Sequence, residues 1–359
     1  MRILVYEYAS GGGLAGRRVP ASLAHEGAAM RAALAADLVA IGSHRIVTTA
    51  DARVPRDLPR SVDVVALPPG DRARAAALDA LVDEVDAVWL IAPETDRCLE
   101  RLAARVEKHR KMLLGSSSDA IRRASDKARL PALLAGDGVR CPATHALGRR
   151  ANPASAARRI GYPVVVKPAR GAGSDGVRLA RSARELQGAV DRARAATRSG
   201  SAVLQPYVRG SAASVSLLVN GLDAIALTVN AQALGGSPPF AYRGGLTPFD
   251  HPRAAQAIAA ATSACRAVRG LRGFVGVDVI LTGAGAVAIV IDPRLTTAYL
   301  GVRAALDENV AALAIAACAG DLPPSAPRAR RRVRFSASGD VVVMEKCVAC
   351  KPRLSARAF

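Results

Sequence analysis

The stretch VVVKPARGAGSDGVRLA, residues 164–180, contains the spacing G-x-G-x-x-G at Gly171, Gly173 and Gly176. This spacing is typical of dinucleotide-binding loops, in which a strand leads through the glycines directly into a helix. Here the glycines precede strand-like residues, Val-Arg-Leu-Ala, and the first helix-start signal is the Ser-x-x-Glu capping box at Ser182. The sequence therefore predicts a β-hairpin with the glycines at its tip, which argues against a Rossmann loop.

Lys167 stands near the end of the apolar run that leads into these glycines. A buried ammonium group is costly unless it meets an anion, and glycines let backbone N–H groups approach phosphate oxygens closely. A phosphate grip is one interpretation of the hairpin. A surface hairpin whose lysine extends into solvent is the other, and residues 164–180 alone leave both open. A Walker loop is excluded because no Gly-Lys-Ser/Thr closes the stretch.

The net charge of the 359-residue chain is +20, which favours an anionic partner. Its 50 basic residues are almost all arginine, however, and only six are lysine. Aromatic residues make up 3% of the chain, which is few for the stacking platforms of nucleic-acid binders, and no nucleic-acid-binding module is recognisable. We therefore expect a nucleotide or another small anion as the partner, and not nucleic acid.

The distribution of cysteines and apolar residues favours a cytoplasmic protein with free thiols. The six cysteines are scattered apart from Cys347 and Cys350, and this C-x-x-C lacks the second pair that a zinc site would need. We expect no signal peptide, because MRILVYEYAS has no long apolar segment. We expect no membrane partner either, because Asn220 and Gly221 interrupt the longest stretch that is poor in charge.

The first part of the chain alternates between strand-like and helix-like patterns up to about Gly115. This alternation predicts a parallel sheet covered by helices on both faces. The expected strands are residues 3–8, 44–49, 62–67, 87–92 and 112–114, and the expected helices are 21–38, 71–85 and 96–110.

The rest of the chain changes to antiparallel patterns. Residues 118–139 predict one helix with glycine stops near its end, and residues 215–229 and 273–292 each predict a hairpin. Residues 234–248 predict a glycine- and proline-rich loop. The other expected elements are strands at 162–169, 176–180 and 201–208, helices starting near 182, 254 and 307, and a small strand pair after the arginine run 328–334.

Several motifs stand in a fixed order around the glycine hairpin. Lys127 lies 40 positions before Lys167, in ASDKARL, and LQPYVRG, GFVGVDVIL and IDPRLTT follow the hairpin in that order. In this order and wording the chain resembles the ATP-grasp superfamily over roughly residues 1–320. Its opening ILVYEYASGGG and its late DPRLTTAYLG are most similar to the branch that contains tyramine–glutamate ligase of methanofuran (methylofuran) biosynthesis.

The resemblance implies an α/β and α+β fold, in which an N-terminal Rossmann-like pre-ATP-grasp domain precedes a two-subdomain ATP-grasp fold. The pre-ATP-grasp domain would occupy residues 1–115, and the first subdomain, with the glycine-rich lid hairpin, residues 116–203. The second subdomain, with the metal site, would occupy residues 204–322, followed by a basic C-terminal extension, 323–359.

The resemblance also implies which residues meet ATP, which would lie between the two subdomains. Lys127 and Lys167 match the lysines that grip the nucleotide. The matching residues of the mobile lid are Gly171, Gly173, Ser174 and Gly176. The matching residues of the linker whose backbone contacts adenine are Gln205, Pro206, Tyr207 and Val208. The family often has Glu where Pro206 stands, and proline removes one N–H donor.

Arg294 and Lys167 are the candidate catalytic residues. Arg294, in Asp-Pro-Arg, matches an arginine that meets the γ-phosphate or the acyl-phosphate, and a planar guanidinium suits either target. Asp278 matches the first carboxylate that holds Mg²⁺, for which Mn²⁺ can substitute.

The metal motif departs from the family pattern. The family usually has Glu-x-Asn-Pro-Arg, whereas this chain has Val290, Asp292 and Arg294 at the corresponding positions. One carboxylate has been lost and another gained two residues away. Because residues 290 and 292 have the same strand parity, both side chains are predicted on one face, so that Asp292 could partly replace the missing ligand.

The resemblance implies an ATP-dependent carboxylate–amine ligase that works through an acyl-phosphate. Its substrates would be ATP, a small carboxylate such as glutamate and a tyramine-like amine, and a homodimer is compatible with it. Two alternatives stay open: a non-catalytic nucleotide-binding partner subunit, suggested by Val290, and an ATP-grasp ligase for another amino acid or peptide.

Overall fold

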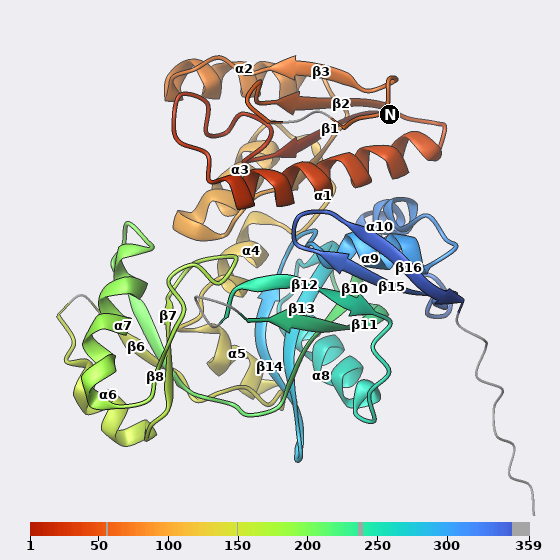
Figure 1. The fold of residues 1–359 in the computed structure, drawn as a ribbon. Coiled ribbons are helices and arrows are strands. Elements are labelled where there is room, and N and C mark those ends of the chain that lie inside the picture. The colour runs from red at the N-terminus through yellow and green to blue at the C-terminus, as the bar shows by residue number, and fades with distance from the viewer. Residues whose placement is uncertain (55–56, 149, 236–239, 347–359) are drawn as a thin grey trace, which may run out of the picture.

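The computed structural model describes the chain apart from residues 55–56, 149, 236–239 and 347–359 (Figure 1). The pair Cys347 and Cys350 therefore lies outside the described residues. No helix of the described chain is long and apolar enough to cross a lipid bilayer.

The N-terminal part is a five-stranded parallel sheet with strand order β3-β2-β1-β4-β5. Its elements are β1 (Arg2–Glu7), α1 (Ala21–Ala40), β2 (Arg45–Ala50), β3 (Asp63–Ala66), α2 (Asp71–Asp83), β4 (Ala87–Ile91), α3 (Cys98–Lys108) and β5 (Met112–Leu113). The predicted alternation and parallel sheet are confirmed. Strand order reverses between β1 and β4, the switch point beyond whose carboxyl ends ligands bind in open α/β sheets. In Figure 1, α1 lies between this sheet and the rest of the chain.

The segment after β4 differs from the helix predicted over residues 96–110. A short 3-10 turn, η1 (Thr95–Arg97), comes first, and the α-helix begins only at Cys98. Asp96 (φ 51°) and Arg97 (φ 61°) have left-handed backbone conformations, which interrupt the right-handed helical path.

The helix predicted over residues 118–139 is also two helices, α4 (Ser118–Ala124) and α5 (Leu130–Gly136). In the break, Asp126 Oδ1 accepts a hydrogen bond from the N–H of Ala128 at 3.1 Å. The N–H of Lys127 donates to the carbonyl of Ala169 at 3.1 Å. These bonds offer the backbone an alternative to the helical ladder, and they place Lys127 beside the glycine hairpin.

The next part is a four-stranded antiparallel sheet in the order β6-β9-β7-β8, covered by two helices. Its elements are β6 (His145–Leu147), α6 (Pro153–Ile160), β7 (Val164–Pro168), β8 (Arg178–Ala180), α7 (Ala183–Ala195) and β9 (Ala202–Pro206). The predicted hairpin is confirmed by the antiparallel pairing of β7 with β8. Helix α7 begins after Ser182 as predicted, but the Ser182 side chain makes no capping bond; instead the Glu185 carboxylate accepts from the N–H of Arg181 at 2.9 Å.

A seven-stranded antiparallel sheet follows, in the order β14-β13-β10-β11-β12-β15-β16. Its strands are β10 (Ser211–Asn220), β11 (Ala224–Leu234), β12 (Tyr242–Thr247), β13 (Arg272–Thr282), β14 (Gly285–Asp292), β15 (Arg331–Ser336) and β16 (Val341–Lys346). Both predicted hairpins are confirmed. The predicted loop over residues 234–248 is wrong in part, because β12 lies within it and pairs with β11.

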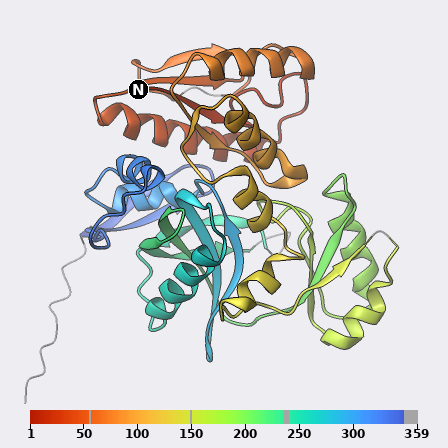
Figure 2. The ribbon, with the colours of Figure 1, turned by 180° about the vertical axis from the view of Figure 1, so that it is seen from behind.

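Three helices pack on this sheet: α8 (Ala254–Ala267), α9 (Ala298–Ala305) and α10 (Val310–Ala319). The sequence did not predict α9. Helix α10 begins three residues later than expected, where the Asn309 side chain accepts a hydrogen bond from the N–H of Ala312 at 3.0 Å. Seen from behind, α8 lies against the sheet, and the yellow helix α5 lies beside α8 (Figure 2).

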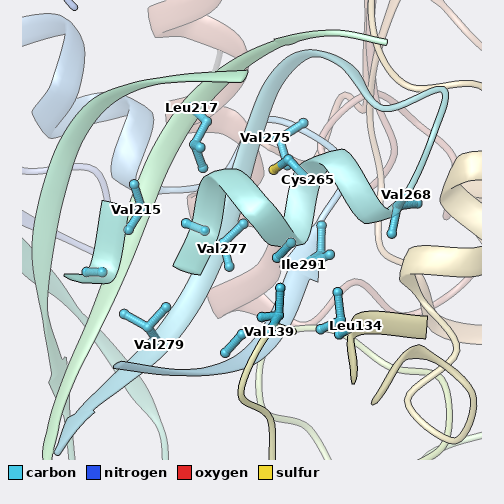
Figure 3. Close-up of a cluster of buried hydrophobic side chains, with 14 of the residues drawn as sticks. Leu134, Val139, Val215, Leu217, Cys265, Val268, Val275, Val277, Val279 and Ile291 are labelled. Carbon is cyan, nitrogen blue, oxygen red and sulfur yellow. The ribbon is translucent and has the colours of Figure 1, made fainter. Parts of the chain in front are cut away.

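One face of the seven-stranded sheet packs against α8 through an apolar core (Figure 3). Val277 and Val279 of β13 and Ile291 of β14 point into it and are at most 1% exposed. The buried faces of α8 are mostly alanine, whose small side chains allow close approach of the helix to the strands. Because side chains alternate along a strand, Asp278 and Asp292 lie on the opposite face.

Candidate active site

Asp278 and Asp292 lie on one face of the β13–β14 hairpin. Asp278 is the direct cross-strand partner of Val290, and Gly276 is the partner of Asp292. Directly opposed residues of an antiparallel pair place their side chains on the same face. The predicted parity of positions 290 and 292 is therefore confirmed, and Val290 lies beside Asp278 where the family has a glutamate.

The surroundings of these two carboxylates disfavour their ionised forms. Burial and the charge of Asp292 raise the pKa of Asp278, although Gln232 Nε2 donates a hydrogen bond to its Oδ1 at 2.7 Å. Burial likewise raises the pKa of Asp292, and the charge of Arg294 opposes this. Two carboxylates that repel each other in a partly buried site are ionised more readily when a cation joins them.

Lys127 and Lys167 reach the same region from the first subdomain. Burial, followed by the charge of Lys127, lowers the pKa of Lys167 to about 8, and the charge of Asp278 counteracts this. Burial also lowers the pKa of Lys127, and the charges of Glu94 and Asp292 offset only part of this effect. Lys127 Nζ donates to the carbonyl of Gly171 at 2.7 Å. Lys127 therefore contacts the glycine hairpin that follows Lys167, and both lysines interact electrostatically with the carboxylate pair.

The glycine hairpin between β7 and β8 contains three left-handed residues: Gly173 (φ 65°), Ser174 (φ 61°) and Gly176 (φ 71°). A Cβ atom at Gly176 would lie 2.6 Å from Cβ of Ala196 and 2.9 Å from Cγ of Pro168. A Cβ atom at Gly173 would meet nothing within 4 Å. The hairpin is therefore packed at its base and open at its tip.

The proposed adenine linker lies at the end of β9. The N–H of Tyr207 donates to the carbonyl of Pro163 at 3.0 Å, and Pro206 has no N–H. A purine here would be contacted by carbonyl groups or by the N–H of Val208. Gln205 is buried, and its Nε2 donates to Thr144 Oγ1 at 2.8 Å.

An open hollow of about 490 Å³ lies next to this linker. Its lining residues are Pro163, Leu179, Arg181, Tyr207 and Arg209. Leu179 pairs with Val165, which is on the same face of its sheet as Lys167. The hollow and Lys167 therefore open toward the same side.

Arg294 is held by a residue from the N-terminal domain that the sequence analysis did not identify. Arg294 Nε donates to Glu94 Oε1 at 2.8 Å and Nη2 donates to Glu94 Oε2 at 3.2 Å. Nη2 is also 3.7 Å from Asp292 Oδ1. Burial lowers the pKa of Arg294, but Glu94 and Asp292 more than reverse this and keep it charged. A sequence signal for Glu94 existed, since it follows a buried parallel strand at its carboxyl end.

Glu26 and Tyr242 also belong to this site, and nothing in the sequence indicated them. Glu26, on α1, accepts a hydrogen bond from Thr297 Oγ1. Burial raises the pKa of Tyr242, and the charges of Asp278, Glu26 and Asp292 add to the effect. The site is therefore bordered by three parts of the chain, because side chains come from α1 and the segment after β4, from β7, and from β12, β13 and β14.

The carboxylate pair fits Mg²⁺ only in part. Carboxylate oxygens are the hard ligands that Mg²⁺ prefers, and one or two of them usually suffice when phosphate oxygens supply the rest. Within the described residues no group of three or more His, Cys, Asp or Glu side chains could hold a metal ion. A bound ion would therefore depend on the phosphates of a nucleotide.

Two family models match this chain. The ATP-grasp domain matches residues 124–298 and the pre ATP-grasp 3 domain matches residues 44–121, together more than two thirds of the sequence. The chain belongs to the ATP-grasp superfamily. The predicted ATP-grasp fold with an N-terminal pre-ATP-grasp domain is thereby confirmed.

Two curated relatives share the name tyramine–L-glutamate ligase. The protein from Methanocaldococcus jannaschii is 33% identical over 101 residues, which cover 28% of this chain and 32% of that protein. The protein from Methanocaldococcus fervens is 28% identical over 221 residues, which cover 62% of each. The matched part thus spans less than two thirds of either relative.

Solved structures share the fold along nearly the whole chain. An ATP-grasp superfamily protein from Archaeoglobus fulgidus has a TM-score of 0.68 at 25% identity and covers 93% of this chain and 92% of its own. The biotin carboxylase complex with βγ-ATP from Campylobacter jejuni has a TM-score of 0.70 at 16% identity and covers 92% and 74%. The L-amino acid ligase from Bacillus licheniformis has a TM-score of 0.66 at 15% identity and covers 93% and 78%.

Proposed function

We propose that this protein is an ATP-dependent ligase that joins a carboxylate to an amine through an acyl-phosphate. One observation carries the proposal: Lys127 and Lys167, from two other elements, interact electrostatically with Asp292 and Asp278, and Arg294 Nη2 lies 3.7 Å from Asp292 Oδ1. Cations facing paired carboxylates suit phosphoryl transfer, which needs positioning and charge neutralisation more than covalent chemistry by the protein.

The nucleotide would lie along the cleft face of the four-stranded sheet. Its adenine would occupy the hollow beside Tyr207, and its phosphates would reach Lys167 and Lys127 under the glycine hairpin. The Lys127–Gly171 hydrogen bond already joins one phosphate-binding candidate to the hairpin, so that both would respond together to an anion. Asp278 and Asp292 would hold Mg²⁺, which neutralises phosphate charge when bound.

The proposed reaction has two steps. A substrate carboxylate oxygen attacks the γ-phosphorus of ATP, and ADP leaves with the bond electrons. The amine nitrogen then attacks the acyl carbon, inorganic phosphate leaves, and the nitrogen loses a proton. Arg294 would stabilise the charge of the transferred phosphoryl group, a role supported by its position 3.7 Å from Asp292 Oδ1 beyond the end of β14.

The substrates that we propose follow from the named relatives. A glutamate carboxyl would be activated and a tyramine-like amine would attack it, in the synthesis of a methanofuran-type one-carbon cofactor. Release of ADP with both substrates, and a product mass equal to their sum minus water, is the expected result. Dependence on another amino acid or peptide would favour a different ligase of the superfamily.

One observation favours a second candidate, a non-catalytic nucleotide-binding partner subunit. Val290 removes a carboxylate directly beside Asp278. ATP binding without ADP release for any carboxylate and amine pair would support this candidate over the ligase.

A further inference from the structure

The segment that follows β4 touches both halves of the ATP-grasp fold. It comprises residues 94–100 and leaves the parallel sheet at the switch point between β1 and β4. Its two consecutive left-handed residues, Asp96 and Arg97, redirect the chain so that neighbouring side chains point to different partners.

The contact with the second subdomain is the Glu94–Arg294 pair. Two hydrogen bonds, of 2.8 and 3.2 Å, fix the plane of the guanidinium. Glu94 is 4% exposed, so water does not compete for this carboxylate. The third donor of Arg294, Nη1, is directed to the carbonyl of Leu295 at 3.1 Å.

The contacts with the lid-bearing subdomain lie a few residues further along. Asp96 Oδ1 accepts a hydrogen bond from the N–H of Arg198 at 2.9 Å. The buried Glu100 carboxylate lies between two guanidinium groups, with Oε2 2.8 Å from Arg97 Nε and 3.8 Å from Arg170 Nη1. Arg170 directly precedes the first glycine of the hairpin and is also bound to Asp126 at 2.9 Å.

We propose that residues 94–100 form a positioning element that joins the catalytic arginine to the base of the lid, an inference that rests on the proposed function. Glu94 is a positioning residue for Arg294, and Glu100 is one for Arg170. The pre-ATP-grasp domain thus sets the geometry of a site that lies between the other two parts of the chain.

The Glu94 contact also protects the candidate metal site. Arg294 Nη2 lies 3.2 Å from Glu94 and 3.7 Å from Asp292, so the two carboxylates compete for one guanidinium. Without the Glu94 charge, Arg294 would pair with Asp292 and compete with Mg²⁺ for that carboxylate. Loss of Glu94 should therefore raise the Mg²⁺ requirement, which a purely structural role would not do.

The test compares Glu94→Gln, Glu94→Asp and Glu100→Gln in the full chain with the matched control Glu107→Gln. Glu107 lies on the same helix as Glu100 and also accepts hydrogen bonds across a junction, from Ser118, but it is not part of the site. We measure the Kd of ATP at saturating Mg²⁺ and its dependence on the Mg²⁺ concentration, kcat, the Mg²⁺ concentration for half-maximal rate, and amide hydrogen exchange over residues 170–177.

Glu94→Gln should lower kcat at least about tenfold and raise the Mg²⁺ requirement at least about threefold, with a nearly unchanged Kd for ATP. Glu94→Asp, which keeps the charge, should recover part of both losses. Glu100→Gln should speed exchange over residues 170–177, and Glu107→Gln should match wild type in every measurement. In an Arg294→Gln background, Glu94→Gln should have no further effect on the Mg²⁺ requirement.

The proposal is overturned if Glu94→Gln leaves the Mg²⁺ requirement at the wild-type value, or if Glu107→Gln reproduces its effects. It is equally overturned if Glu100→Gln leaves exchange over residues 170–177 unchanged. If Glu94→Gln fails to fold, the Mg²⁺ requirements of Glu94→Asp and of Glu94→Gln in the Arg294→Gln background test the proposal instead. Failure of the proposed ligase reaction is a separate result, in which wild type releases no ADP. In that case the Mg²⁺ dependence of ATP binding and the exchange rates still test the positioning element.

Discussion

Asp278 and Val290 are direct cross-strand partners, so a methyl-bearing side chain faces the carboxylate that the superfamily pattern pairs with a glutamate. The next pair on the same face is Gly276 with Asp292, which brings a second carboxylate back to the site two positions away. The site thus keeps two carboxylates in a changed arrangement.

Lys167 and Lys127 should both be needed for ATP binding. Lys167→Ala should weaken the binding of ATP by about 1.5–3 kcal/mol, because a charge-assisted hydrogen bond to phosphate is lost. Lys127→Ala should have a similar effect and should also free the carbonyl of Gly171. Isothermal titration calorimetry gives the affinities, with Lys108→Ala, on the far end of α3, as the control. Wild-type affinity in both single variants would contradict the assignment.

ATP affinity should fall as pH rises through about 8. The pKa of Lys167 without ligand is lowered to about 8, and phosphate binds its charged form. Between pH 7 and pH 9 the free protein loses this proton, so the affinity should fall about tenfold, one pH unit above the pKa costing about 1.4 kcal/mol.

Lys167→Arg is the matched variant for this pH dependence, because a guanidinium stays charged over the whole range. Its affinity should change less between pH 7 and pH 9 than that of wild type. Any dependence that remains belongs to Lys127, whose pKa burial also lowers, and to Asp278, whose pKa burial raises toward this pH range. An equal fall in wild type and Lys167→Arg would exclude Lys167 as the titrating group.

The β7–β8 hairpin should behave as a lid with a fixed base. Hydrogen exchange over residues 170–177 should slow when a non-hydrolysable ATP analogue and Mg²⁺ are added, because the small residues of the tip make few apolar contacts without ligand. Equal exchange with and without bound analogue would show that the hairpin does not close.

Two glycines of the lid should respond differently to alanine. Gly173→Ala should cost only the backbone strain of a left-handed residue, about 1–2 kcal/mol. Gly176→Ala should cost more, because its Cβ would also lie 2.6 Å from Ala196 and 2.9 Å from Pro168. Exchange-derived opening free energies of the β7–β8 pair measure the difference. A smaller cost for Gly176→Ala than for Gly173→Ala would contradict the packed base.

Local patterns predicted the hairpin because its information lies within the 22 consecutive residues 164–185: an apolar strand, glycines, a second strand and only then a helix start. A local signal for a break existed in Pro131, which is tolerated in the first turn of a helix, where α5 has it, but this signal does not explain the conformation at Lys127. Residues 118–139 have helical propensity, and the interruption depends on the carbonyl of Ala169, far along the chain. Strand β12 was hidden for a related reason, since Gly244 and Gly245 are poor strand formers that pairing with β11 and β15 holds in place.

The site shows the same division between local and distant information. Lys167, Asp278 and Arg294 stand in recognisable motifs, so they could be named as candidates before the fold was known. Glu26 comes from α1 and meets Thr297, 271 positions away. Its place depends on how the pre-ATP-grasp domain packs on the second subdomain, and a single sequence does not encode that packing as a local pattern.

The metal site should depend on Asp278 and Asp292. Asp278→Asn and Asp292→Asn should each remove most Mg²⁺-dependent ADP release, because Mg²⁺ would then keep one protein carboxylate and the phosphates. Val290→Glu should place a third carboxylate next to Asp278 and lower the Mg²⁺ concentration needed for half-maximal rate. Val290→Gln, which has the same size without the charge, is its control.

Repulsion among the carboxylates should oppose the gain in Mg²⁺ affinity from Val290→Glu. Burial raises the pKa of both carboxylates, and the charge of Asp292 adds to the effect at Asp278, so an added glutamate would be harder to ionise without a cation, and ATP binding in the absence of Mg²⁺ should weaken. Steady-state ADP release across a Mg²⁺ titration distinguishes these effects. Full activity of Asp292→Asn would show that Asp292 is not a ligand. A Val290→Glu variant that requires more Mg²⁺ than Val290→Gln would show that repulsion outweighs the gained ligand.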